Sequence, residues 1–540
     1  MFRDLPENIQ AMVLEKCLVR PRGTAHATRS NLPLLAVCPQ WRRIVAPMVY
    51  GHVFVHYDER HRDEDGSSPG SSSLNSDEAV DVSISTNLGL VAAAGTASAA
   101  TPLKIHVHYL ASPLPGWREV VQRLRGAASE WPTVELTLGM SKDAPSSRRA
   151  ADLAKLHADG IAEVADALTA LLPGVRSLEL GRTDGDKFAA ALYGRLAGHY
   201  AGQLQRLHSQ SPVAVPAGCQ LAGLESLRVD CANEIKYQLP RTASAGLVDL
   251  ALKNGAVNHS WAPFSSSGGG SRVIEFPRLE RLRAEYIATA RERGKAVHHR
   301  DGHPWVLRLP RLKSLYVHSL EDICPLLEYA ALPPAVESVS LTLTSAAFRE
   351  IADVALPAAA RLSLTLSSTS GGDPSGLPAI GRILDGARDS RVLRLAINDP
   401  GLRVVPASIA CSALTHLEIA GPVGIDTMLA FIGRMPRLAR LAINSLDLSD
   451  SHADVSAAVG DVSAAVEPLS TSLRELVLHF GAEQRLLDTA VAAAEHVLLR
   501  APALTALVAK RIPAGPVVRF VEAHAPHHPH LRGVELRLQQ

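Results

Sequence analysis

The sequence contains few aromatic residues: phenylalanine, tryptophan and tyrosine together make up 4% of its 540 positions. Its apolar residues, 46% of the chain, are therefore mostly leucine, alanine and valine. A chain of this length exceeds what one ordinary hydrophobic core supports, so it forms either several domains or one long repeat array. Small aliphatic side chains suit short, similar units stacked in series better than one large irregular core.

The sequence also lacks an excess of charge, a cysteine framework and a long apolar run. The 55 basic and 54 acidic residues leave a net charge of +1, which favours neither nucleic acid nor a membrane surface as a partner. The six cysteines are scattered without a C-x-x-C motif, and we expect buried thiols in a reducing compartment. The smoothest apolar run, residues 88–100, is shorter than a membrane span, and the N-terminus has no signal-peptide pattern. A cytoplasmic or nuclear location is therefore expected.

Motifs for catalysis are missing as well. The chain has no G-x-S-x-G, no P-loop, no dinucleotide-binding glycine set and no H-E-x-x-H, so we expect neither an enzyme nor a cofactor. Histidines gather in two loop-like stretches that have no nearby cysteine to complete a tetrahedral metal site. We interpret them as solvated loop residues and predict no metal there; they are His298, His299 and His303 in the first group and His524, His527, His528 and His530 in the second.

What the sequence does contain is a short recurring pattern: an apolar residue, two residues, a second apolar residue, one residue, and a third apolar residue. Leu279–Ala284, Leu312–Val317 and Leu438–Ile443 are clear copies. The spacing between successive copies varies from 20 to 35 residues. Their first apolar positions are Val175, Leu204, Leu224, Leu247, Leu279, Leu312, Val336, Ala359, Val392, Leu414, Leu438, Leu473, Leu504 and Leu531.

Helical stretches rich in alanine and leucine lie between many of these copies. The clearest are Phe188–Tyr200, Pro325–Ala331, Phe348–Leu356, Ile380–Ala387, Asp426–Arg434 and Arg485–Arg500. A short strand followed by a helix at this period resembles the leucine-rich repeat. The resemblance implies an α/β solenoid with parallel strands on one face and helices on the other, stacked into one continuous core. The asparagine of the family pattern is mostly missing, so we expect an irregular array without an asparagine ladder.

The first fifty residues follow a different pattern. Leu5-Pro6-Glu7 opens an amphipathic helix, and apolar residues between positions 32 and 45 predict two further short helices. The stretch Val37-Cys38-Pro39-Gln40-Trp41-Arg42 lies within this apolar region. In this order these motifs resemble an F-box, over roughly residues 2–50. The segment departs from the family in a longer loop, residues 20–31, and in Pro39.

The F-box resemblance implies that the chain binds the Skp-type adaptor of a cullin ubiquitin ligase. The adaptor-binding residues implied by it are Leu5, Pro6, Ile9, Val13, Leu34, Val37 and Trp41. The alternative interpretation of this segment is a helical cap on the solenoid, with Trp41 in its core. A three-helix piece of this size buries too little surface to be stable alone and needs a partner or the following domain.

The expected domain organisation is therefore an F-box-like helical module at 1–50, a linker at 51–100 and a repeat solenoid at 101–540. Within the linker, residues 58–78 are polar and predict a disordered loop. Loop insertions are expected in the solenoid near 260–271, 291–304 and 447–466. Alternation in Leu103–Tyr109 and Val134–Leu138 predicts two half-buried strands before the regular repeats.

Recognition residues are expected on the open face of the sheet. If the three apolar positions of a copy point into the core, the residues between them point outward. The position before the second apolar residue is basic in four successive copies, which predicts a basic stripe that binds an acidic or phosphorylated peptide. The candidate substrate-binding residues are Arg281, Arg283, Arg361, Arg394, His416 and Arg440. The alternative is a solvated face with arginine stems lying on the sheet.

Two functions follow from these patterns. The first is the substrate-recognition subunit of an SCF-type E3 ubiquitin ligase, with the adaptor on residues 1–50 and a protein target on the repeats. The second is a leucine-rich-repeat scaffold unrelated to ubiquitin. An enzyme whose site no motif reveals is a distant third.

Overall fold

The computed structural model divides the chain into two compact units, Met1–Ser271 and Arg272–Gln540. The residues that it describes are 52–61, 80–89, 91, 102–110, 112–125, 131–140, 153–181, 187–210, 219–230, 243–253, 273–284, 306–317, 330–331, 336–344, 359–367, 390–397, 413–447, 468–480 and 487–539. The F-box-like segment 1–50 and all seven adaptor-binding residues expected in it lie outside the described residues, as do the predicted loops 260–271 and 291–304 and nearly all of 447–466.

The first unit is built on an open, mostly parallel sheet. Its described strands follow the order β2–β1–β3–β4–β5–β6–β7–β8, in which β2 pairs antiparallel with β1 and the other neighbours are parallel. The strands are β1 (Val53–His61), β2 (Val80–Thr86), β3 (Leu103–Tyr109), β4 (Thr133–Met140), β5 (Ser177–Leu180), β6 (Arg206–Ser209), β7 (Ser226–Asp230) and β8 (Asp249–Lys253).

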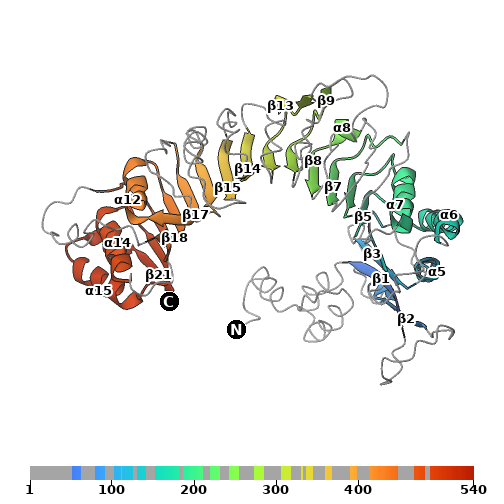
Figure 1. The fold of residues 1–540 in the computed structure, drawn as a ribbon, viewed down its shortest axis with the longest axis horizontal. Coiled ribbons are helices and arrows are strands. Elements are labelled where there is room, and N and C mark those ends of the chain that lie inside the picture. Colours follow the sequence, from blue (N-terminus) through green and yellow to red (C-terminus); the bar gives the residue numbers. More distant parts are fainter. Residues whose placement is uncertain are drawn as a thin grey trace. The chain divides into compact units, whose positions relative to one another are not determined.

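The helices of the first unit lie along one side of its sheet (Figure 1), and α5 packs against β1 and β3. They are α5 (Leu114–Leu124), α6 (Leu153–Leu171), α7 (Lys187–His199) and the short α8 (Ala243–Gly246). Helix α5 approaches the sheet closely at Gly116, where an added Cβ would lie 2.7 Å from the Tyr57 ring and 2.8 Å from Val107. Trp117, the next residue, is fully buried. This contact leaves the opposite sides of β1 and β3 free to carry polar residues.

A buried tyrosine links α7 to two neighbouring strands. The Tyr193 hydroxyl donates to the carbonyl of Leu178, 3.0 Å away on β5, and also lies against the carbonyl of His208 on β6. Burial raises the pKa of Tyr193 well above its ordinary value, so the hydroxyl stays a proton donor. The strand order of the repeats is thereby reinforced from the helix side.

The second unit repeats the parallel arrangement. Its main sheet follows the order β10–β12–β14–β15–β16–β17–β18–β19–β20–β21, and β9, β11 and β13 form a separate small parallel sheet. The strands are β9 (Val273–Glu275), β10 (Arg281–Ala284), β11 (Val306–Arg308), β12 (Ser314–Val317), β13 (Ala330–Ala331), β14 (Val336–Thr344), β15 (Ala359–Ser367), β16 (Val392–Ile397), β17 (His416–Gly424), β18 (Arg440–Asp447), β19 (Glu475–Phe480), β20 (Ala506–Lys510) and β21 (Glu535–Gln539).

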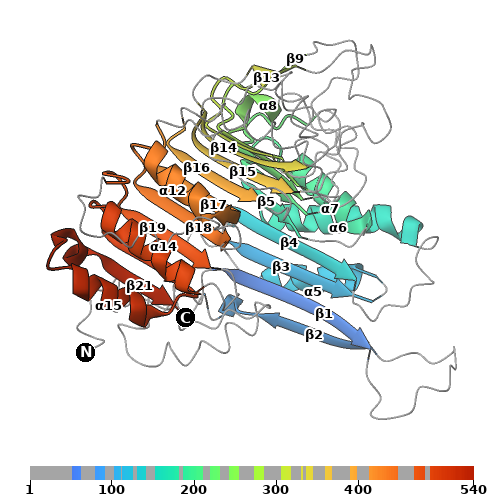
Figure 2. The same ribbon diagram turned by 60° about the vertical axis from the view of Figure 1, so that its left-hand side comes forward.

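The helices of the second unit are described at its C-terminal end, where they cover the apolar side of the strands (Figure 2). They are α12 (Ile425–Arg434), α14 (Leu487–Arg500), α15 (Ala514–His524) and the 3-10 helix η8 (Pro529–Gly533). None of the described helices in either unit combines the length and apolarity needed to cross a bilayer. Met428, Phe431 and Ile432 of α12 are almost fully buried and form part of the core under β17 and β18.

The sequence predictions of individual elements agree with the described residues at most positions. The strand predicted at Leu103–Tyr109 is β3, and the helices predicted at Phe188–Tyr200, Asp426–Arg434 and Arg485–Arg500 are α7, α12 and α14. The helix predicted over Pro325–Ala331 is wrong at its end, because Ala330 and Ala331 form β13. The helices predicted at Phe348–Leu356 and Ile380–Ala387 lie outside the described residues.

The linker prediction is wrong over its first residues. Strand β1 continues to His61, so Asp58–His61 belong to the sheet rather than to a loop that begins at residue 58. The strand extends this far because β2 pairs with it up to His61. Asn87 fixes the other end of this pair: its side chain accepts from the Phe54 backbone N–H and donates to the His52 carbonyl.

All the first apolar positions of the repeat copies are buried except Val392. No asparagine ladder holds the copies together in the described residues. Instead, a backbone carbonyl just before one strand accepts two successive N–H groups from the next copy, as Glu280 does from Lys313 and Ser314. The hydroxyls of Thr415 and Thr505 donate to carbonyls at equivalent places. Backbone hydrogen bonds therefore set the register, and side-chain hydroxyls add to them.

Candidate functional site

The open face of the second unit consists of rows of side chains that run across the strands. The cross-strand register defines one row as Arg281, Ser314, Ser338, Arg361, Val392, His416, Arg440 and Glu475. The adjacent row is Arg283, Tyr316, Ser340, Ser363, Arg394, Glu418 and Ala442. All six predicted substrate-binding residues are on these two rows, and all six are exposed.

The expected basic stripe is interrupted at β16. Arg394 does not align with Arg361 and His416; it lies opposite Ser363 and Glu418 in the adjacent row, and Val392 takes the place that the stripe requires. The reason is a shift of two residues in the buried triplet. Ser390, which is 2% exposed, occupies the first inward position, followed by Leu393 and then Leu395. A buried serine does not match an apolar pattern, so the pattern selected Val392 instead.

Two of the arginines on this face are paired with acids on neighbouring strands. Arg394 Nε lies 3.1 Å from a carboxylate oxygen of Glu418, and Arg440 Nε lies 3.5 Å from one of Glu475. Arg283 stacks over the Tyr316 ring, with its guanidinium carbon 4.7 Å from the ring centroid. These exposed pairs contribute about 0–1 kcal/mol each, so an incoming anion can replace the acid at little cost.

A different set of polar side chains occupies the open face of the first unit. Here the ion pairs join adjacent strands β3 to β4 and β5 to β6: Lys104 Nζ lies 2.7 Å from Glu135, and His208 Nδ1 lies 2.6 Å from Glu179. The hydrogen bond from His208 lowers the pKa of Glu179 below its ordinary value, against the opposing effect of burial. Each of these side chains is only partly accessible to solvent.

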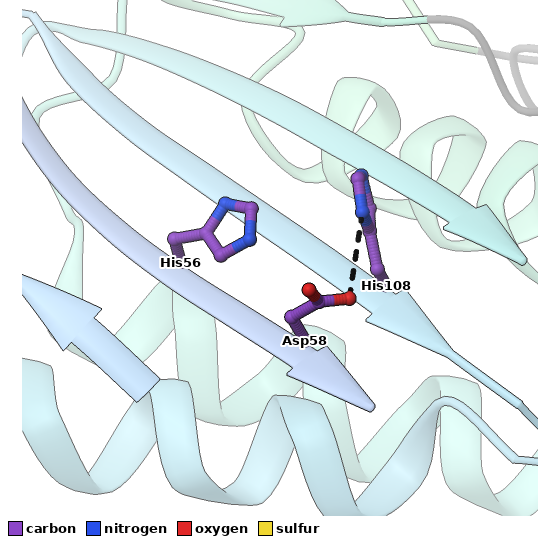
Figure 3. A group of neighbouring side chains, drawn as sticks. All are labelled: His56, Asp58 and His108. Carbon is purple, nitrogen blue, oxygen red and sulfur yellow. Dashed lines mark ion pairs between the residues drawn. The ribbon is translucent and has the colours of Figure 1, made fainter. Parts of the chain in front are cut away.

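Next to these pairs, a histidine cluster lies on β1 and β3 (Figure 3). His56 and Asp58 of β1 and His108 of β3 place their ligand atoms within 4.8 Å of one another. His106 lies opposite His56 in the register, with 5.9 Å between the ring centroids. Burial, followed by the neighbouring histidines and Lys104, lowers the pKa of His106 to about 3, so its ring is neutral at pH 7.

No sequence pattern predicted this cluster. The histidines considered as metal ligands belong to two other stretches, and of these His528 and His530 have rings 5.9 Å apart but belong to no described metal-ligating group with a carboxylate. The available signal was two strand-like stretches with His-x-Asp and His-x-His spacing, since residues two apart on a strand share a face. The first group, His298, His299 and His303, lies outside the described residues.

No protein-family model and no curated protein sequence matches this chain. Its function must therefore be argued from its own residues.

Proposed function

We propose that this chain is the substrate-recognition subunit of an SCF-type ubiquitin ligase. The N-terminal segment binds a Skp-type adaptor, and the repeat sheet binds a protein target. The chain catalyses no reaction itself; it raises the effective concentration of the target near the ligase. Two features support the proposal: the F-box-like order of motifs in residues 2–50, and an open sheet face with exposed, weakly paired arginines.

The observation that supports target binding is that those arginines are exposed and only weakly paired. Arg394 and Arg440 are exposed on strands β16 and β18, and each is paired with a partly exposed acid, Glu418 or Glu475. A bidentate bond from a guanidinium to a carboxylate or phosphate is stronger than a neutral hydrogen bond. An acidic or phosphorylated segment that lies across β16–β19 would replace Glu418 and Glu475 as partner. The proposed target is therefore a protein with such a segment.

The adaptor half of the proposal is tested by co-purification. Full-length protein and a variant that lacks residues 1–50 are each mixed with the Skp-type adaptor. We expect only the full-length chain to retain the adaptor. If the full-length chain does not bind it, the ubiquitin role fails, and a repeat scaffold is the remaining function.

The target half is tested by charge reversal. The variant Arg394→Glu/Arg440→Glu should lose target capture in a comparison of co-purified proteins, while adaptor binding stays intact. Arg308→Glu is the matched control, because Arg308 is an equally exposed arginine paired with Glu275 but lies on the small sheet, at β11. Target capture that survives the double reversal would place the binding surface elsewhere.

A further inference from the structure

The two parallel strands β1 and β3 each present side chains two residues apart on the same side of the sheet. On β1 these are His56 and Asp58, and on β3 they are His106 and His108. The register places His56 opposite His106 and Asp58 opposite His108. Four groups that commonly bind metals thus occupy the corners of one small patch, about 7 Å along the strands by 5 Å across them.

We propose that this patch binds a divalent transition-metal ion of the zinc class through His56, Asp58 and His108. The three ligand atoms lie within 4.8 Å of one another, and His108 Nδ1 is 3.9 Å from Asp58 Oδ1. Two ligands of a tetrahedral zinc ion are about 3.3–3.5 Å apart, because each lies about 2.0–2.2 Å from the metal. The side chains therefore need to close by about 1 Å, which rotation about their broad terminal torsions allows.

The ligand types define which ions fit. Imidazole nitrogens bind zinc, copper, nickel and iron in preference to magnesium or calcium, which require oxygen ligands. A single carboxylate among three histidines gives an oxygen count too low for calcium. Asp58 is 6% exposed, and a divalent cation is the strongest partner that a buried carboxylate can have. We therefore expect selectivity for zinc over magnesium.

The surroundings of the patch leave a fourth position open. His108 has 41% of its side chain exposed, so solvent reaches the ligands from one side. His106, opposite His56 in the register, is a further candidate ligand, and its Nε2 is buried with no hydrogen-bond partner in the described part of the chain. Lys104, the closest cation along β3, is held by Glu135 at 2.7 Å, which offsets its charge next to a metal. The fourth ligand is then His106 or a water molecule.

The packing beneath the strands fixes the spacing of the ligands. On the other side of the sheet, Gly116 of α5 packs against Tyr57 and Val107, the residues that alternate with the ligands. Glu59, also on that side, accepts hydrogen bonds from the Tyr57 hydroxyl and from the Leu110 N–H. The strand positions that carry the ligands are therefore set before any metal binds, as a selective site requires.

The experiment uses the full-length chain, freed of metal with a chelator and titrated with Zn²⁺ by calorimetry. We expect one ion per chain at this site, no competition from equimolar Mg²⁺, and a higher Tm on binding. Each of His56→Ala, Asp58→Asn and His108→Ala should weaken the affinity by about tenfold or more. With Co²⁺ as a spectroscopic probe, His106→Ala should change the coordination signature if His106 is the fourth ligand and leave it unchanged if water is.

His528→Ala is the matched control, since it removes a histidine that also lies near another histidine ring but belongs to the second unit. His56→Asn and His108→Gln keep similar volume and polarity, and the Tm of each variant without metal shows whether it is folded. A Zn²⁺ stoichiometry of zero would overturn the proposal. So would a site that persists unchanged in folded His56→Asn/His108→Gln protein. Neither result bears on adaptor or target binding.

Discussion

The open faces of the two units differ in how deeply their charges are buried. In the first unit, the side chains of Lys104 and Glu135 are 27% and 22% exposed, and those of His208 and Glu179 are 18% and 35% exposed. In the second unit, Arg394 and Glu418 are 66% and 43% exposed. The same repeat thus presents paired charges in two environments, partly desolvated in one unit and solvated in the other.

This difference separates two uses of one architecture. Partly buried charges are costly to leave without a partner, so they favour a fixed arrangement such as a metal site. Exposed pairs contribute little to stability and exchange their partners easily, which suits recognition of another protein. The helix sides of the two units show no such contrast, because both bury the same leucine, valine and aromatic residues.

The largest expected effects test whether the hydrophobic cores on the helix sides of the two units contribute equally to stability. Trp117→Ala in the first unit and Phe431→Ala in the second each remove a fully buried aromatic side chain, and we expect a loss of about 3–5 kcal/mol in the free energy of unfolding for both. Urea unfolding measures it. Trp117→Phe is the control and should cost less, since it keeps most of the volume. A loss in one unit only would show that the cores differ too.

The second prediction concerns the contrast in charge burial itself. Glu135→Gln leaves Lys104 without its carboxylate in a partly buried position, and we expect a loss of about 1–2 kcal/mol in the free energy of unfolding. The matched change Glu418→Gln, next to Arg394, should cost less than about 0.5 kcal/mol. Urea unfolding at low salt compares the two variants. Equal losses of unfolding free energy in the two variants would show that the ion pairs of the two open faces do not differ in their contribution to stability.

The third prediction uses pH and concerns a buried histidine on the helix side of the second unit. His496 of α14 is 8% exposed, and burial, followed by the charge of Arg500, lowers its pKa. Below its ordinary pKa of 6.5 the unfolded chain takes up a proton that the folded chain does not. Stability from this group is therefore present above pH 6.5 and is lost as the pH falls below it.

The variant His496→Gln should flatten this dependence, because glutamine still accepts the hydrogen bond from the Arg500 guanidinium at 3.2 Å but does not titrate. Urea unfolding at pH 7.5 and pH 5.5 gives the comparison. The parent protein should lose more stability over this interval than the variant. Identical losses would mean that His496 titrates normally in the folded state.

The fourth prediction concerns the aromatic contact on the open face of the second unit. Tyr316→Leu removes the ring under the Arg283 guanidinium, and we expect a cost of about 0.5–1 kcal/mol in the free energy of unfolding. A double-mutant cycle with Arg283→Met isolates the interaction from the loss of the ring itself. A coupling energy well above this range would indicate that this part of the exposed face is structural.

The local pattern of the sequence predicted the elements well because each depends on nearby residues. Alternation in Leu103–Tyr109 predicted the strand with its bounds, and the helical stretches between copies of the pattern predicted α7, α12 and α14. The α/β class with parallel strands also followed from the repeated triplet. The F-box-like segment and the binding of an adaptor stay predictions, since residues 1–50 lie outside the described residues.

The candidate sites were predicted less well because they depend on register between strands. The arginines were correctly expected on the open face, but Arg394 is one row away from Arg361 because Ser390 fills a position that the pattern reserved for an apolar residue. Asp58 was assigned to a loop, and only its pairing in β1 brings it beside His108.

The sequence by itself determined the repeat, the alternation of inward and outward residues and the composition of each face. These properties follow from periods of two and about 3.6 residues within a segment. The tertiary structure decided which outward residues become neighbours. Cross-strand hydrogen bonds set that register, and they join residues such as Asp58 and His108 that are far apart along the chain. No local pattern carries that information, because a shift of one residue in pairing preserves the pattern and changes every neighbour.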